Sequence, residues 1–242
     1  MTFKSFSDYL SFEKNYSPHT INAYVKDLES FSNFCEIEYN EKNIDKVNYS
    51  QIRSWIINLV ENNISNRSIN RKVSSLNSYY KFLLKIETIK INPLIKHKAL
   101  KTEKKIQIPF SQLEVETVLN DFQYDNTFEG LRNKAIIELF YSTGIRRIEL
   151  VNIKLTDINL QNKTLKVLGK RNKERILPLL TSTSNTLNEY LIERNKLPIV
   201  SDKTMLFLTK KGVKIYETLV YRIINEYFSI ASSKVKKSPH IL

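Results

Sequence analysis

The segment SNRSINRKVSSLNSYYKFLLK, residues 65–85, decides how the first part of the chain folds. Its apolar residues recur every three or four positions, and this spacing places them on one face of a helix. They are Ile69, Val73, Leu76, Tyr80 and Leu83. We therefore expect an amphipathic helix from about Ser65, with this stripe buried in a helical domain.

The opposite face of this predicted helix carries cations and hydroxyl groups and no acidic residue. Its members are Arg67, Arg71, Ser74, Ser78 and Lys81. On a single helix, such a face is most often simply solvated. Here the lack of acid favours contact with phosphates and base edges, and we predict that these five residues bind DNA.

The neighbouring sequence predicts more helices and then a linker. Ser17 is expected to cap a helix beginning at Pro18, because proline is favoured at the first helical position. Another helix is expected from about Ser50. Asn92-Pro93 breaks helical structure, and lysines then accumulate, so residues 87–107 are a predicted basic linker between residues 1–86 and 108–242. The linker could lie along a DNA backbone or be only a solubilising tether.

The second part of the chain has a mixed pattern. It predicts helices near Leu131–Tyr141, Ser182–Arg194 and Tyr216–Ala231, and two strands, Lys163–Leu168 and Arg175–Leu179. A polar, cationic turn joins the strands as a hairpin. The predicted fold class is mainly α with a small β-sheet, in two domains.

Composition and charge narrow the range of functions that the chain can have. The 242 residues have a net charge of +13, with 17 Lys and Arg against 11 Asp and Glu in residues 1–107, and 21 against 14 in residues 108–242. Basic charge in both parts favours a polyanion partner, above all nucleic acid. A single cysteine excludes an internal disulfide framework, and three scattered histidines lack zinc-ligand spacing. Without a signal segment or membrane span, we expect a cytoplasmic protein.

Three segments carry residues suited to phosphate chemistry. Gly144 allows a sharp turn into a helix that starts with Arg146, and Glu149 one turn later can orient that arginine. Lys170 lies in the hairpin turn, and His240 lies near the end of the sequence. Each is weak evidence alone, because helical Arg–Glu pairs and turn lysines usually have no catalytic role.

In this order, the segments resemble the tyrosine recombinase and phage integrase family, most closely its Xer branch. The resemblance rests on Tyr16–Thr20, Ser68–Leu76, Tyr141–Leu150, Gly169–Arg175 with Pro178, and Ser238–Leu242. It implies an N-terminal helical core-binding domain of SAM-like type and a catalytic domain, closing around double-stranded DNA. Family members assemble as tetramers on DNA.

The resemblance also implies a reaction and the residues that perform it. A tyrosine attacks the scissile phosphate, gives a 3′-phosphotyrosyl link, and needs no metal, ATP or other cofactor. Arg146 would bind the phosphate oxygens, Lys170 would protonate the leaving 5′-oxygen, and His240 would assist proton transfer. Glu149 would hold Arg146.

Two features depart from the family pattern. The second arginine would fall just beyond Leu242 and the nucleophile later still, whereas all 13 tyrosines precede His240. We therefore expect a truncated chain that holds DNA without cutting it, with tetramer assembly impaired. A non-catalytic DNA-binding protein with the recombinase fold stays open as an alternative, as does a basic helical protein with no DNA role.

The second departure is Arg147, which replaces a small or apolar residue of the family pattern. The spacing to Lys170 favours Arg146, rather than Arg147, as the catalytic arginine.

Overall fold

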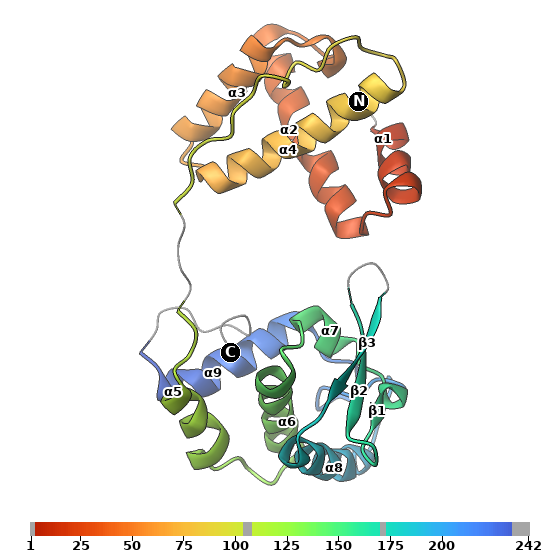
Figure 1. The fold of residues 1–242 in the computed structure, drawn as a ribbon, viewed down its shortest axis with the longest axis vertical. Coiled ribbons are helices and arrows are strands. Elements are labelled where there is room, and N and C mark those ends of the chain that lie inside the picture. Colours follow the sequence, from red (N-terminus) through yellow and green to blue (C-terminus); the bar gives the residue numbers. More distant parts are fainter. Residues whose placement is uncertain (1–2, 104–107, 170–172, 234–242) are drawn as a thin grey trace. The chain divides into compact units, whose positions relative to one another are not determined.

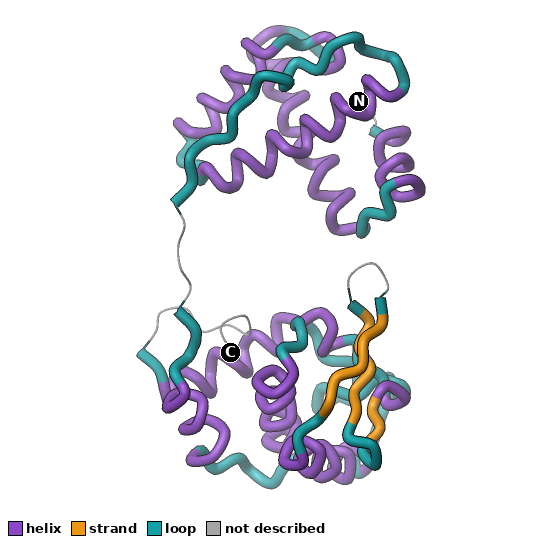
Figure 2. Tube along the Cα trace, viewed as in Figure 1, coloured by secondary structure: helices purple, strands orange, loops and turns teal. Residues whose placement is uncertain are grey.

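A computed structural model of the chain describes residues 3–103, 108–169 and 173–233. The chain divides into two compact units, Met1–Lys105 and Ile106–Leu242 (Figure 1). Helices predominate in both units, and the second also contains a three-stranded sheet (Figure 2). The predicted class, mainly α with a small β-sheet, is confirmed.

The first unit is helical throughout its described elements. These are α1 (Lys4–Asp8), a π-helical turn (Tyr9–Glu13), α2 (Pro18–Tyr39), a 3₁₀ turn (Ile44–Lys46), α3 (Tyr49–Glu61) and α4 (Asn66–Lys85). Ser17 and Ser65 cap α2 and α4, each accepting a hydrogen bond from a backbone N–H three residues later. Asn48 caps α3, which begins within one residue of the predicted start near Ser50.

The core of the first unit forms where α4 packs on α2 and α3. The five apolar residues of the α4 stripe are at most 4% exposed, as their spacing predicts. Trp55 of α3 packs on Phe31 of α2, with ring centroids 5.0 Å apart. Phe6 of α1 contacts Tyr79 of α4 edge to face. The face of α4 opposite the stripe is thereby directed away from this core.

The segment after α4, which includes most of the predicted linker, packs against the first unit. Residues 86–101, here called the strap, run back along the first unit. The Asn70 side chain donates to the Leu100 carbonyl at 2.8 Å and accepts from the Leu100 N–H at 2.9 Å. Asn66 donates to the Lys101 carbonyl at 2.8 Å, and Leu94 is 4% exposed. Paired backbone groups and buried apolar area therefore fix the strap to α4, and residues 104–107 lie outside the described part.

The second unit surrounds α6. Its elements are α5 (Gln112–Glu116), a π-helical turn (Thr117–Asp121), α6 (Phe128–Thr143), α7 (Arg147–Val151), a 3₁₀ turn (Leu155–Asp157), β1 (Ile158–Asn159), β2 (Thr164–Leu168), β3 (Glu174–Pro178), α8 (Thr181–Asn195) and α9 (Glu217–Ala231). The strands are antiparallel in the order β1-β2-β3. Helix α6 packs chiefly on α8 and also contacts α9.

The sheet positions the hairpin beside α7. In the β2–β3 pair, Leu165 faces Leu177 and Val167 faces Arg175. Leu165 and Val167 are buried in the core of the unit. Strand β1 was not predicted, because two residues are too short to show a periodic pattern. None of the helices in the described ranges combines the length and the hydrophobicity of a membrane span.

Candidate active site and nucleic-acid interface

The turn between α6 and α7 places Arg146 at the start of a helix. Gly144 ends α6 in the left-handed conformation, with φ of 58°, a conformation that glycine adopts without a Cβ clash. Arg146 then occupies the N-cap position of α7 in an extended conformation. Its backbone N–H donates to the Glu149 carboxylate at 2.9 Å. The Gly-turn and the acid three residues after Arg146 thus place this arginine as the sequence predicts.

Glu149 is the centre of the candidate site. Its carboxylate accepts a hydrogen bond from Arg146 Nη1 at 2.9 Å, and from Arg175 Nη1 and Nη2 at 2.9 and 2.8 Å. The side chain of Glu149 is only 4% exposed. The bonds from Arg175 do most to lower the pKa of Glu149, to about 2, and Arg146 lowers it further while burial opposes both. Glu149 therefore stays ionised, and two guanidinium groups share one carboxylate.

This arrangement leaves the site cationic. Two arginines and one glutamate sum to a single positive charge, and the Arg146 side chain is 63% exposed. Among the described residues, only Glu149 accepts a hydrogen bond from the Arg146 guanidinium. A guanidinium has five N–H donors in a planar fork, so Arg146 retains donors for an external oxyanion. The cluster can therefore bind a phosphate.

Sequence reasoning missed Arg175 as a member of this cluster. Burial alternates along β3, and Arg175 and Leu177 lie on its less exposed side. The bond to Glu149 raises the pKa of Arg175 and keeps it charged. An arginine at an inward position of a predicted strand needs hydrogen-bond acceptors, but the sequence alone does not show which residue supplies them.

Gly169, at the end of β2, allows the close approach of Arg175. A Cβ atom at Gly169 would lie 3.0 Å from Arg175 Nη1 and 3.5 Å from Glu149 Oε1. Its N–H donates to the Lys173 carbonyl at 2.8 Å and closes the hairpin. The residue before Lys170 thus lies against the arginine–glutamate cluster.

We predict that Gly169→Ala displaces Arg175 and lowers the stability of the second unit by about 1–2 kcal/mol. Denaturant unfolding of Gly169→Ala, Arg175→Gln and the double variant measures this. The two effects should overlap, because both act on one contact. Gly144→Ala is the control, since its Cβ would meet nothing within 4 Å and its cost is backbone strain alone. If the losses in unfolding free energy of Gly169→Ala and Arg175→Gln simply add in the double variant, the close approach of the two residues is unimportant.

The predicted catalytic residues are only partly within the described chain. Arg146 and Glu149 lie together as expected, while Lys170 and His240 lie outside the described residues. Arg147 is engaged elsewhere, since its Nε donates to Glu217 of α9 at 2.9 Å. Arg146 and Arg147 thus have different carboxylate partners.

The predicted DNA-binding face lies on α4 of the first unit. Arg67, Arg71, Ser74 and Lys81 are exposed, and Ser78 is half-buried. The Ser74 hydroxyl donates to the Asn70 carbonyl within the helix. Although this face of α4 carries no acidic residue of its own, a carboxylate from another helix contacts it. Asp27 of α2 accepts two hydrogen bonds from Arg71. Sequence pattern within α4 alone did not reveal this carboxylate.

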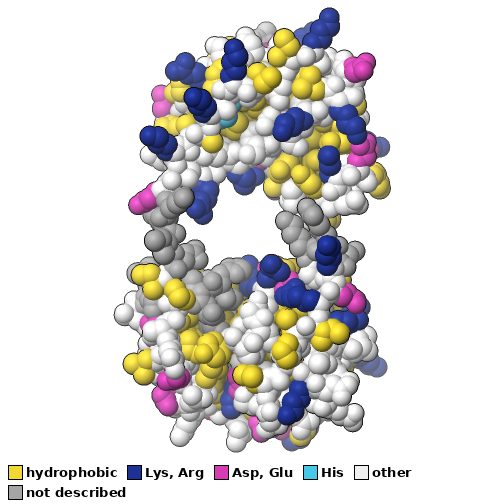
Figure 3. All heavy atoms as spheres, in the orientation of Figure 1, with side chains coloured by type: hydrophobic (Ala, Val, Ile, Leu, Met, Phe, Trp, Pro, Cys, Tyr) yellow, Lys and Arg dark blue, Asp and Glu magenta, His cyan; other side chains and the backbone are white. Residues whose placement is uncertain are grey.

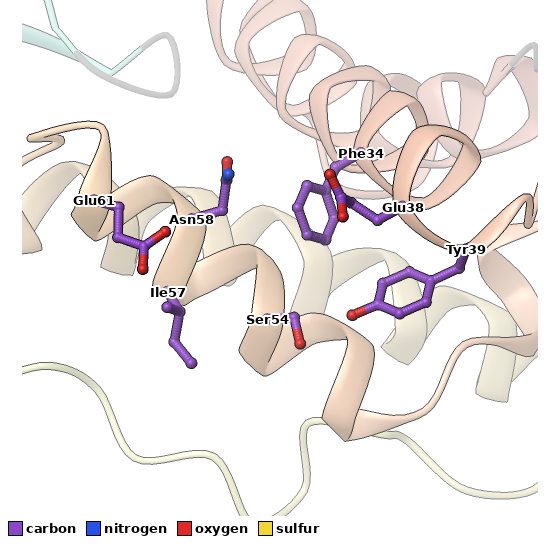
Figure 4. A pocket seen from close by; sticks show the side chains of 7 residues that line it. All are labelled: Phe34, Glu38, Tyr39, Ser54, Ile57, Asn58 and Glu61. Atoms are coloured by element: carbon purple, nitrogen blue, oxygen red, sulfur yellow. The ribbon is translucent and has the colours of Figure 1, made fainter.

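Surface charge agrees with a polyanion partner for both units. Lys and Arg side chains lie on the viewed face of each unit (Figure 3). A hollow between α2 and α3 has the opposite character, since Glu38 and Glu61 line it together with Phe34, Tyr39, Ser54, Ile57 and Asn58 (Figure 4). With two carboxylates and no cation in its lining, this hollow does not suit DNA.

Comparison with known proteins agrees with this geometry. Residues 3–86 match the family described as "Phage integrase, N-terminal SAM-like domain", and residues 112–242 match the "Phage integrase family". Tyrosine recombinase XerC of Anoxybacillus flavithermus is 38% identical over 99% of this chain and 80% of its own length. Tyrosine recombinase XerC of Leptospira interrogans is 39% identical over 93% of this chain and 72% of its own length.

Solved structures share the fold. The site-specific recombinase XerH bound to palindromic difH substrate aligns with a TM-score of 0.75 at 19% identity, over 94% of this chain and 67% of that one. The Tn1549 transposon integrase in complex with circular intermediate DNA aligns with a TM-score of 0.71 at 18% identity, over 98% of this chain and 82% of that one.

Proposed function

Since the chain belongs to the phage integrase family of site-specific tyrosine recombinases, we propose that it binds double-stranded DNA and serves in strand cleavage and rejoining at a specific site. The solved relatives XerH and Tn1549 integrase carry DNA in their structures, which supports duplex DNA as the partner. We further propose the family's tetramer on DNA as the working assembly.

The cationic cluster around Glu149 carries this proposal. Phosphoryl transfer builds negative charge on the non-bridging phosphate oxygens, and a guanidinium fixed in place stabilises that charge. The Glu149 carboxylate accepts hydrogen bonds from the backbone N–H and from the guanidinium of Arg146, and so fixes this residue in place. Most of the Arg146 side chain nevertheless stays exposed. In our proposal, Arg146 binds the scissile phosphate and Glu149 holds it there.

Two further residues complete the proposed chemistry. Lys170, which follows Gly169 in the sequence, donates a proton to the leaving 5′-oxygen. His240 assists proton transfer or binds a phosphate oxygen. In the family's reaction, a tyrosine hydroxyl attacks the phosphorus and gives its proton to a base, and the P–O bond to the 5′-oxygen breaks. No tyrosine of this sequence is assigned that role. The 3′-phosphotyrosyl link preserves the bond energy for rejoining. On α4, Arg67, Arg71, Ser74, Ser78 and Lys81 contact the DNA backbone and base edges.

Repeated selection from a pool of randomised duplexes tests site specificity. We expect the protein to enrich one sequence motif, bound at least about 10³-fold more tightly than random duplex. Binding without enrichment would contradict a site-specific function and leave a general DNA-binding protein. With the enriched site in hand, an SDS-stable protein–DNA adduct lost in Arg146→Ala would establish cleavage, and its absence despite tight binding would favour the non-catalytic alternative.

A further inference from the structure

A buried carboxylate in the first unit holds two cations of α4. Asp27 of α2 is 2% exposed. It accepts hydrogen bonds from Arg71 Nη1 at 2.6 Å and Nη2 at 2.9 Å, from Lys72 Nζ at 3.1 Å, and from the Ser75 hydroxyl at 2.8 Å. All four donors come from one face of α4, so the contact ties α2 to the predicted DNA-binding helix.

The two cations differ in how far they reach the surface. The side chain of Arg71 is 50% exposed, whereas that of Lys72 is 20% exposed. Asp27 uses two of the five N–H donors of Arg71, so a planar edge of the guanidinium retains donors for another acceptor. One carboxylate between two cations leaves the cluster with a net positive charge. A phosphate is therefore still attracted to it.

We propose that Asp27 is a positioning residue for DNA binding, which fixes the Arg71 guanidinium in one orientation before DNA arrives. An arginine side chain loses rotamer freedom when it binds, and a fixed side chain has already lost it. The bidentate pair also sets the plane of the guanidinium, and hence the direction of its remaining donors. This inference rests on the proposed DNA-binding function of α4.

Charge alone and positioning predict opposite effects on DNA affinity when the Asp27 carboxylate is removed. Asp27 is negative, so neutralising it raises the net charge by one and should strengthen binding to a polyanion. If Asp27 positions Arg71, then Asp27→Asn weakens binding despite the added positive charge. The sign of the change thus separates positioning from charge.

The test measures affinity for a duplex by fluorescence anisotropy for wild type, Asp27→Asn and Glu29→Gln. Glu29 is exposed two residues along the same helix, so Glu29→Gln makes the same charge change outside the cluster. We expect Asp27→Asn to lower affinity about five- to tenfold, and Glu29→Gln to raise it up to about twofold. Equal tightening in both variants would overturn the proposal and leave Asp27 a purely structural link between α2 and α4.

A second variant keeps the proposal testable if Asp27→Asn does not fold. Arg71→Lys keeps the charge and an ion pair with Asp27 but loses the planar, bidentate geometry. We expect it to lower affinity about fivefold, with a melting temperature within a few degrees of wild type. Unchanged affinity in Arg71→Lys would contradict the proposal even if Asp27→Asn fails to fold. Failure of wild type to bind any duplex would instead reject the DNA-binding function itself.

Discussion

Replacing Arg67 and Arg71 together with alanine is expected to lower the affinity for duplex DNA about a hundredfold at moderate salt. Each lost phosphate contact costs roughly tenfold in affinity and reduces the slope of log K against log salt by about 0.9. Both side chains are exposed on α4, opposite the buried stripe. Anisotropy titrations across a salt series measure the affinity and the slope together.

Arg146→Ala is the comparison for that double variant. Arg146 supplies one phosphate contact at the candidate active site, so most of the affinity should remain. Melting curves must show both variants folded, because Arg71→Ala leaves buried Asp27 with Lys72 and Ser75 as its only partners in the described part of the chain. We assign most of the DNA affinity to the first unit and the chemistry to the second. Loss of affinity in Arg146→Ala, with the Arg67 and Arg71 double variant unaffected, would contradict this assignment.

Replacing Glu149 with alanine is expected to destabilise the second unit by about 3 kcal/mol. The change leaves Arg146 and Arg175 without the carboxylate that they share, and the like charges then repel. Glu217→Ala serves as the control, because Glu217 is 41% exposed and pairs only with Arg147 among the described residues. Such an exposed pair contributes at most about 1 kcal/mol. Denaturant unfolding of both variants measures the difference.

The stability of the second unit should also depend on pH through Glu149. The pKa of Glu149 lies near 2 in the folded chain, against an ordinary value of 4.5. A depressed pKa means that the stabilisation is fully present above 4.5 and is lost as the pH falls towards 2. Glu149→Ala should lack this component of acid destabilisation. Parallel pH profiles for the two proteins would contradict a stabilising role for the ion pairs of Glu149 with Arg146 and Arg175.

Local sequence patterns were sufficient to predict the framework of the site. The stripe from Ile69 to Leu83 predicts α4, and Gly144 followed by Arg146 and Glu149 predicts the turn into α7. Both signals lie within a few turns of one helix, where residue spacing translates directly into direction. The hairpin is visible in the same way, because β2 and β3 adjoin in sequence.

The pairings between distant segments could not be predicted from spacing. Asp27 and Arg71 are 44 residues apart, and Glu149 and Arg175 are 26 apart. Which acid meets which arginine depends on how whole elements pack, and the charge pattern of a single helix does not contain that information. The strap was missed for a similar reason, since a lysine-rich segment resembles a tether until asparagines on α4 pair with its backbone.

The dependence of duplex affinity on salt tests the central claim most directly, namely that a basic chain of this family binds the DNA backbone through several cations. Between about 50 and about 200 mM salt, six or more phosphate contacts should lower the affinity of the 242-residue chain roughly 10³-fold. Failure to bind duplex DNA at low salt, or a change of less than about threefold over this range, would contradict the account.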